Sequence, residues 1–216
     1  MERYIIWDID GTVVDTRKAI SSAYLHALSV LGIEEQDGTR IYQYVGKRSS
    51  LIFSECHNLA GEALQKARDA YYGFFETTGL AMCDLYPGIQ ELLCELQQNG
   101  AVMTVASARG QGQLDMMLDK LGIASYFSLV LGTELNHLAA DKPKLVRECI
   151  DFMGAAPQQC VMVGDRIYDI QGGQLSGTRS IGVTYGFGTR EELNQCAPDA
   201  IAEDVASLRA LLLGVE

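Results

Sequence analysis

The chain has 216 residues, of which 48% are hydrophobic and 21% are charged, and its formal net charge at pH 7 is −11. This length predicts one large or two small domains, and the composition is that of an ordinary soluble globular protein rather than a disordered or low-complexity chain. The acidic balance argues against nucleic acid as a partner, because a basic face normally supplies most of that affinity.

The first part of the chain is expected to be one strand followed by helices. Residues 3–8 form an apolar, β-branched and aromatic run typical of a buried strand, and acidic residues follow directly. Three helical patterns come next, at residues 16–32, 49–60 and 61–79. No convincing strand is expected between residues 15 and 80.

The remainder alternates strands with helices. Strands are expected at residues 101–107, 127–132, 160–165 and 179–186. Helices are expected at residues 89–100, 113–122, 142–154, 168–177, 189–195 and 204–213. Apolar strands that alternate with helices predict a parallel sheet covered on both faces. We therefore expect a doubly wound, Rossmann-like α/β core made of residues 1–14 and 82–216, with a small all-helical domain, residues 15–81, inserted after the first strand.

Polar side chains follow four of the expected strands. In an open parallel sheet, ligands bind at the carboxyl ends of the strands. Four carboxylates, one hydroxyl and one ammonium are expected to meet there: Asp8 and Asp10, then Ser107 with Ala108 and Arg109, then Lys142, then Asp165 and Asp169. Because hard divalent cations prefer oxygen ligands, this group predicts a magnesium site.

Four motifs in this order resemble those of the haloacid dehalogenase superfamily. They are "DIDGT" (8–12), the serine that ends "AVMTVAS" (101–107), the first lysine of "DKPKL" (141–145) and "GDRIYD" (164–169). The last motif is weak by itself, but the four in order are specific. Within the superfamily, nearly the whole chain resembles phosphoglycolate phosphatase-like hydrolases, which have a helical cap domain between the first two motifs.

The resemblance implies a magnesium-dependent phosphatase that acts on a small phosphorylated metabolite. Phosphoglycolate, other short phospho-acids, sugar phosphates, nucleotides and pyrophosphate all stay open as substrates. Asp8 would be the nucleophile and form an aspartyl-phosphate, and Asp10 would transfer the protons. Ser107 and Lys142, with the backbone at Gly11 and Ala108, would hold the phosphate oxygens. The implied magnesium ligands are Asp8, the Asp10 carbonyl and Asp165, together with Asp169 directly or through water.

The cap in such enzymes closes over the site and contacts the leaving group. Its stretch "YVGKRSS" (44–50) presents Lys47 and Arg48 as a basic tip that could meet a carboxylate or a second phosphate. The alternative is that both are exposed side chains on a surface loop.

Several single residues keep a second interpretation. Ser107 and Asp169 could be helix caps only. Lys144 competes with Lys142 for the site. Arg109 could orient the serine loop or pair with an acid.

Other functions are also weighed. A calcium loop is disfavoured because a strand precedes the acid pair and Ala19 stands at the twelfth position, where glutamate is required. Asp10 argues against a haloacid dehalogenase and against a phosphonoacetaldehyde hydrolase. A β-phosphoglucomutase-type mutase stays open, although Thr12 favours hydrolysis. A non-catalytic binding or regulatory module is disfavoured because every catalytic position is filled.

The six cysteines include no C-x-x-C pair, and no apolar run is long enough for a membrane span. Met1, Glu2 and Arg3 lead straight into the first strand, so no signal peptide is expected. We expect a cytoplasmic protein with reduced thiols, without membrane or nucleic-acid partners, that acts as a monomer or homodimer.

Overall fold

The structure is a computed structural model that describes residues 1–47, 51–134 and 141–214. Six strands form one sheet in the order β5-β4-β1-β6-β7-β8, and all neighbouring pairs are parallel. Their bounds are Tyr4–Trp7 (β1), Val102–Gly110 (β4), Leu129–Thr133 (β5), Cys160–Gly164 (β6), Arg179–Val183 (β7) and Ala200–Ala202 (β8). The expected parallel α/β sheet is confirmed.

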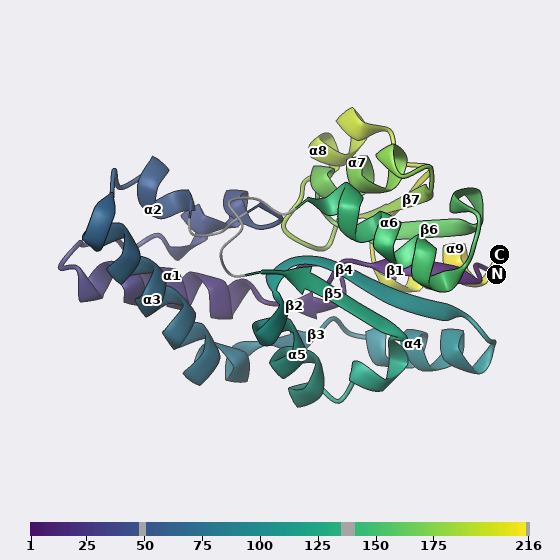
Figure 1. The fold of residues 1–216 in the computed structure, drawn as a ribbon, viewed down its shortest axis with the longest axis horizontal. Helices are drawn as coiled ribbons and strands as arrows, with labels where there is room; N and C mark the ends of the chain where they lie inside the picture. The colour runs from purple at the N-terminus through teal and green to yellow at the C-terminus, as the bar shows by residue number, and fades with distance from the viewer. Residues whose placement is uncertain (48–50, 135–140, 215–216) are drawn as a thin grey trace.

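Helices cover both faces of this sheet (Figure 1). Ile5 and Trp7 point to one face, where they share a core with α4 (Ile89–Gln98), α5 (Gln111–Lys120) and α9 (Val205–Leu213). Ile6 points to the other face and packs with α6 (Lys142–Met153). α7 (Ile167–Leu175) lies next to α6, and α8 (Arg190–Cys196) lies next to α7. The fold is therefore doubly wound, because successive residues of a strand face opposite sides.

Between β2 (Val14–Asp15) and β3 (Asp84–Leu85), the described elements are all helical. They are α1 (Arg17–Val30), α2 (Leu51–Glu55), α3 (Gly61–Thr77) and 3-10 helices at Gly38–Tyr44 and Gly79–Met82. We call residues 16–83 the helical segment. In Figure 1 it extends to the left, away from the end of the sheet where both termini lie. Buried side chains of its helices belong to the same hydrophobic core as Ile5 and Trp7. To this core α1 contributes Ala19, Ala23 and Ala27, which are spaced about one helical turn apart.

Three strands are not expected from the sequence, and a fourth is longer than expected. β2 and β3 pair with each other over two residues each, and β8 has three residues, which is too short for a recognisable period. β4 runs beyond Ser107 to Gly110, because Gly110 pairs with Thr133 of β5 after an irregularity.

None of the described helices is both long and apolar enough to cross a membrane. All six cysteines are free.

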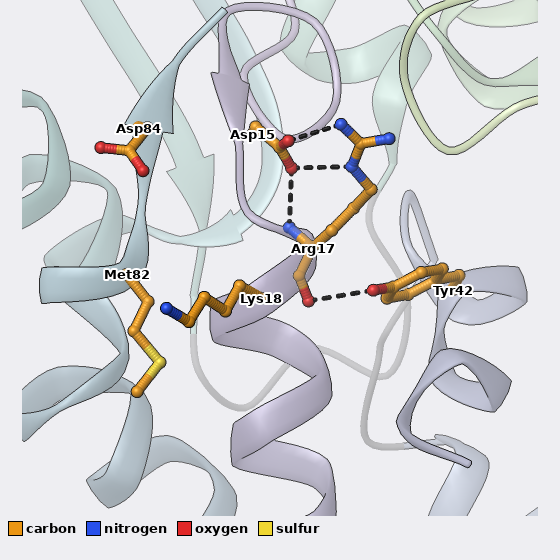
Figure 2. A pocket seen from close by; sticks show the side chains of 6 residues that line it. All are labelled: Asp15, Arg17, Lys18, Tyr42, Met82 and Asp84. Atoms are coloured by element: carbon orange, nitrogen blue, oxygen red, sulfur yellow. Dashed lines mark hydrogen bonds and ion pairs between the residues drawn. The ribbon is translucent and has the colours of Figure 1, made fainter.

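A pocket lies beside the β2–β3 pair (Figure 2). Its lining comprises Asp15, Arg17, Lys18, Tyr42, Met82 and Asp84. Asp15 accepts hydrogen bonds from the backbone and the guanidinium of Arg17, and the Tyr42 hydroxyl donates to the Arg17 carbonyl at 3.3 Å. The pocket lining includes none of the site residues expected from the sequence, and the expected core residues Asp8, Asp10, Ser107, Lys142, Asp165 and Asp169 are buried elsewhere.

Candidate active site

The expected site residues meet at the carboxyl ends of β1, β4 and β6. Trp7 of β1 lies opposite Val105 of β4 and Val163 of β6, so β1 and β6 end at nearly the same level, while β4 continues beyond it to Gly110. Asp8 follows β1 and Asp165 follows β6, while the chain crosses from one side of β1 to the other between β5 and β6. Such a switch in strand order is where parallel sheets bind ligands.

Lys142 lies at the centre of this group, with a side chain that is 3% exposed. Its Nζ donates to Asp8 Oδ1 at 2.7 Å and to the Ala106 carbonyl at 2.7 Å. It also forms an ion pair with Asp169 Oδ1 at 2.7 Å, without hydrogen-bond geometry. Burial opposes the charged form, but Asp169 and Asp8 outweigh it and raise the pKa of Lys142 above its usual value. Lys144, the competing lysine, is exposed and pairs with Glu148 on its own helix.

Three buried carboxylates lie together, and two of them, Asp8 and Asp169, contact this ammonium. Asp8, Asp165 and Asp169 each offer an oxygen, and these oxygens lie within 4.8 Å of one another. Burial, followed by the Asp169 charge, raises the pKa of Asp8 from 3.8 to about 7, with Lys142 acting in the opposite direction. Burial and the charges of Asp169 and Asp8 raise the pKa of Asp165 well above 3.8. Ionised together, three carboxylates and one ammonium leave two negative charges in a low-dielectric space.

These residues fit a divalent cation. Asp165 Oδ1 is buried and has no hydrogen-bond partner, whereas Asp165 Oδ2 accepts from the Phe187 amide at 2.6 Å. A buried oxygen without a partner is costly unless a ligand satisfies it. Asp169 is engaged differently: its Oδ2 accepts from the Arg166 amide at 3.0 Å, so it also serves as a helix cap.

The side chain of Asp10 forms its hydrogen bonds with residues outside the acidic cluster. Arg109 Nε donates to Asp10 Oδ2 at 2.8 Å, and Arg109 Nη2 donates to Oδ1 at 2.6 Å. Thr16 Oγ1 donates to the same Oδ1 at 2.7 Å. Arg109 thus pairs with an acid, and its backbone amide also donates to Ser107 Oγ at 3.2 Å. Arg109 therefore makes both kinds of contact expected for it, one with an acid and one with the serine of its own loop.

Of the expected phosphate-binding residues, Lys142 and Gly11 lie against the cluster, and Ser107 and Ala108 follow Ala106, whose carbonyl accepts from Lys142. Ser107 is buried, and the Ala108 carbonyl accepts from Thr133 Oγ1 at 3.1 Å. Gly11 has a φ of +88°, and a Cβ there would lie 2.3 Å from Asp165 Oδ2. The motif therefore needs glycine both for its left-handed backbone and for the close approach to Asp165.

Lys47 lies beside the fourth motif, with Nζ 5.7 Å from the ring centroid of Tyr168. Tyr168 belongs to "GDRIYD", between Asp165 and Asp169. Arg48 lies outside the described residues. Because Lys47 sits at Tyr168, the loop before it is held against the motif that supplies two of the clustered carboxylates.

Arg166 is the residue that holds this loop, and sequence reasoning missed it. Its Nη1 donates to the carbonyls of Val45 and Tyr42 at 2.6 and 3.0 Å, and its Nε donates to Glu192 Oε1 at 2.8 Å. We call these four residues the Arg166 bridge. The sequence offers one signal for this role, which is the position of an arginine between the two acids of "GDRIYD". Its partners lie 26 or more residues away, so the local sequence does not predict these contacts. The Phe187 amide was missed because it lies 22 residues from Asp165. Thr16 is only six residues from Asp10, but no sequence signal indicates that its hydroxyl turns back to this carboxylate.

Comparison with known proteins agrees with this geometry. A family model described as haloacid dehalogenase-like hydrolase matches residues 5–183. A 5'-nucleotidase of Pseudomonas aeruginosa is 32% identical, over 96% of this chain and 94% of the relative. A phosphoglycolate phosphatase of Vibrio cholerae is 26% identical, over 98% and 97%.

Solved structures agree as well. The crystal structure of a predicted phosphatase from Clostridium acetobutylicum superposes with a TM-score of 0.90, at 28% identity and over 99% of both chains. The match therefore includes the helical segment as well as the sheet. With four motifs at the ends of parallel strands, a matching family model and relatives of full length, the chain belongs to the haloacid dehalogenase-like hydrolases, as its sequence predicts.

Proposed function

We propose that this protein is a magnesium-dependent phosphatase that hydrolyses a small phosphorylated metabolite through an aspartyl-phosphate on Asp8. The observation that supports it most is the buried cluster of Asp8, Asp165 and Asp169, in which Lys142 pairs with Asp8 and Asp169. Such a cluster suits phosphoryl transfer, in which negative charge on the transferring group has to be compensated while the nucleophile is held in line.

In the first step, an Asp8 oxygen attacks phosphorus as the bond to the leaving oxygen breaks. Lys142 donates to Asp8 Oδ1 at 2.7 Å, so Oδ2 is the proposed attacking atom. Asp10 gives its proton to the leaving oxygen. In the second step, Asp10 removes a proton from water, the water oxygen attacks phosphorus, and the bond to Asp8 breaks. Inorganic phosphate and free Asp8 result.

The remaining core residues orient the phosphate. The proposed contacts to its oxygens are the Ser107 hydroxyl, the Lys142 ammonium and the backbone at Gly11 and Ala108. Magnesium would be held by Asp8, the Asp10 carbonyl, Asp165 and Asp169, the last directly or through water. When bound, it would offset the repulsion between the phosphate and Asp8.

We propose that the helical segment is the cap domain, expected at residues 15–81, and that it selects the leaving group. Lys47 and Arg48 are the proposed contacts to an anionic group there. Phosphoglycolate, a short phosphorylated acid, is the first candidate substrate. Nucleoside 5'-monophosphates are the second, because the 32% identical relative is a 5'-nucleotidase.

The test is a panel of phosphate monoesters with magnesium and with excess chelator, run on the wild type and on Asp8→Asn. We expect phosphate release by the wild type with magnesium only, and turnover lower by orders of magnitude in the folded Asp8→Asn variant. Activity of that variant within about tenfold of wild type would overturn the assignment of the nucleophile. Interconversion of hexose phosphates without phosphate release would instead favour the mutase.

A further inference from the structure

The backbone of a short loop lies against the carboxylate of Asp165. This loop, residues 185–188 with the sequence "YGFG", follows β7 and comes before α8. The Phe187 amide donates to Asp165 Oδ2 at 2.6 Å, and the Gly188 amide donates to the same oxygen at 3.4 Å. Both donors therefore face one oxygen of the carboxylate, whereas Asp165 Oδ1 is buried and has no hydrogen-bond partner among the described residues.

Two glycines permit this close approach of the loop. A Cβ on Gly186 would lie 2.4 Å from Asp165 Oδ2 and 2.3 Å from the Gly11 carbonyl oxygen. A Cβ on Gly188 would lie 1.9 Å from the Asp165 carbonyl oxygen. Because these distances are far below van der Waals contact, a larger residue at either position would push the loop away from Asp165.

The Phe187 side chain connects this loop to the helical segment. Its ring lies beside Gly11, since a Cβ on Gly11 would be 2.7 Å from Phe187 Cδ2. The ring also meets the Tyr42 ring edge-on, at 5.2 Å between centroids. Tyr42 is in turn held to the core, because Arg166 Nη1 donates to its carbonyl at 3.0 Å. Phe187 thus contacts Asp165 through its backbone and the helical segment through its ring.

We propose that Phe187 is a positioning residue for magnesium binding. Its amide holds Asp165 so that Oδ1 is presented to the ion, and its ring makes the affinity for the ion depend on Tyr42 of the helical segment. This proposal rests on the proposed function, in which Asp165 holds magnesium. Hydrogen bonds to a metal-binding carboxylate fix its orientation, and losing one typically lowers metal affinity about 10–100-fold.

The consequence is a link between metal binding and the seat of the helical segment. While Tyr42 packs on Phe187, the Phe187 amide is held on Asp165 Oδ2. If the loop before Lys47 moves away, the Phe187 ring loses this aromatic neighbour and the amide loses its alignment. Magnesium binding then weakens even without a substrate. A purely structural contact would change the stability of the fold, but it would not change the affinity for magnesium.

The experiment measures magnesium binding in the absence of any phosphate ester. Magnesium chloride is titrated into the wild type and into each variant, and the Kd is obtained from the rise in Tm. The Tm without magnesium is recorded as well, because a structural defect lowers that value without changing the Kd. Gly186→Ala pushes the loop from Asp165, whereas Phe187→Leu and Tyr42→Leu remove the ring contact and keep the amide.

We expect Gly186→Ala to raise the magnesium Kd about 10–100-fold. Phe187→Leu and Tyr42→Leu should each raise it about 3–10-fold, which is the size of one aromatic pair. The double variant should bind no more weakly than the single variants, because both changes act through the same amide. Tyr42→Phe should keep the wild-type Kd, since it loses only the hydroxyl that donates to the Arg17 carbonyl.

Two controls are matched to these changes. Gly73→Ala adds a methyl group in α3 where, among the described residues, nothing outside the backbone of its own helix lies within 4 Å. Tyr72→Leu removes an edge-on contact with Tyr71, also at 5.2 Å between centroids and within α3. Both variants should bind magnesium as tightly as the wild type.

An unchanged magnesium Kd in Gly186→Ala would overturn the proposal, and if that variant does not fold, an unchanged Kd in Phe187→Leu would do so. Equal effects of Tyr42→Phe and Tyr42→Leu, or additivity of Tyr42→Leu with Phe187→Leu, would overturn the link to the helical segment.

The variant Asp165→Ala separates this failure from failure of the proposed function. If Asp165→Ala weakens magnesium binding while the loop variants do not, Asp165 holds the ion without help from Phe187, and only the present proposal fails. If magnesium does not raise the Tm of the wild type, or if Asp165→Ala leaves the Kd unchanged, the assignment of the metal ligand fails and the Phe187 proposal fails with it.

Discussion

Arg166 of the core and Val45 of the helical segment are joined by a 2.6 Å hydrogen bond, in which Nη1 donates to the carbonyl oxygen. The same nitrogen donates to the Tyr42 carbonyl, and the Tyr42 ring meets Phe187 edge-on at 5.2 Å between centroids. Gly46 fits against this surface, since a Cβ there would lie 2.9 Å from the Tyr168 ring. The loop before Lys47 is thus seated by specific contacts.

We expect Arg166→Met to lower kcat/KM for the natural substrate by about 10–100-fold, mainly by raising KM. A change of this size corresponds to the loss of one or two charge-assisted hydrogen bonds. The reason is that the loop carrying Lys47 loses its two anchors. Steady-state kinetics check this, with Arg190→Met, which removes an exposed pair with Glu203, as the control. A change in the magnesium requirement with an unchanged KM would show that Arg166 serves the metal site instead.

Removing the metal is expected to abolish phosphatase activity, and adding magnesium is expected to restore it. Asp165→Ala should raise the required magnesium concentration more than Asp169→Ala. Asp165 Oδ1 is buried without a partner and suits direct ligation, whereas Asp169 already contacts Lys142 and the Arg166 amide. Magnesium titrations of activity and of Tm measure both effects, because a ligand at about 100 times its Kd adds about 2.7 kcal/mol. Asp119→Ala, on the exposed side of α5, is the control; full activity in excess chelator would contradict the magnesium proposal.

The pair Lys47 and Arg48 is expected to matter only for an anionic leaving group. The double change Lys47→Ala with Arg48→Ala should lower kcat/KM about 10–100-fold on such a substrate and scarcely affect a small neutral aryl phosphate. Lys144→Ala, which removes an exposed lysine of α6, is the matched control. Equal losses on both substrates would mean that these residues serve folding or closure of the helical segment. No loss on either substrate would mean that Lys47 and Arg48 are exposed side chains on a surface loop and do not contact the substrate.

His57 is expected to make stability depend on pH. Its Nε2 lies 2.7 Å from the Tyr24 hydroxyl, and burial, followed by the Arg40 charge, lowers its pKa below 6.5. As pH falls through 6.5, the unfolded chain binds the proton first, so the contribution of His57 is complete above this pH and is lost below it. Thermal unfolding of wild type and His57→Gln at pH 7.5 and pH 5 should show a larger acid-induced loss in the wild type. Equal losses would contradict it.

Local sequence predicted the parts of the fold that repeat within a few residues. The apolar runs of β1 and β6 and the helical spacing of α1 and α3 are visible in that range, and so are the acids that follow the strands. β2 and β3 are two residues long and exist only because Val14 and Leu85 meet in space. The fork of Arg109 on Asp10 and the carbonyl contacts of Arg166 join residues about 100 or more positions apart, so no local period announces them.

The pairing of Val14 with Leu85, and of Asp15 with Asp84, has a consequence for how such a protein can change. The chain leaves the core at β2 and returns to it at β3, so the two covalent connections of the helical segment lie side by side. An insert of different size or shape needs only to end at the same two-residue pair to leave Asp8, Lys142 and Asp165 where they are. Such an exchange of the insert can alter which molecules are accepted while the chemistry beneath it is inherited intact.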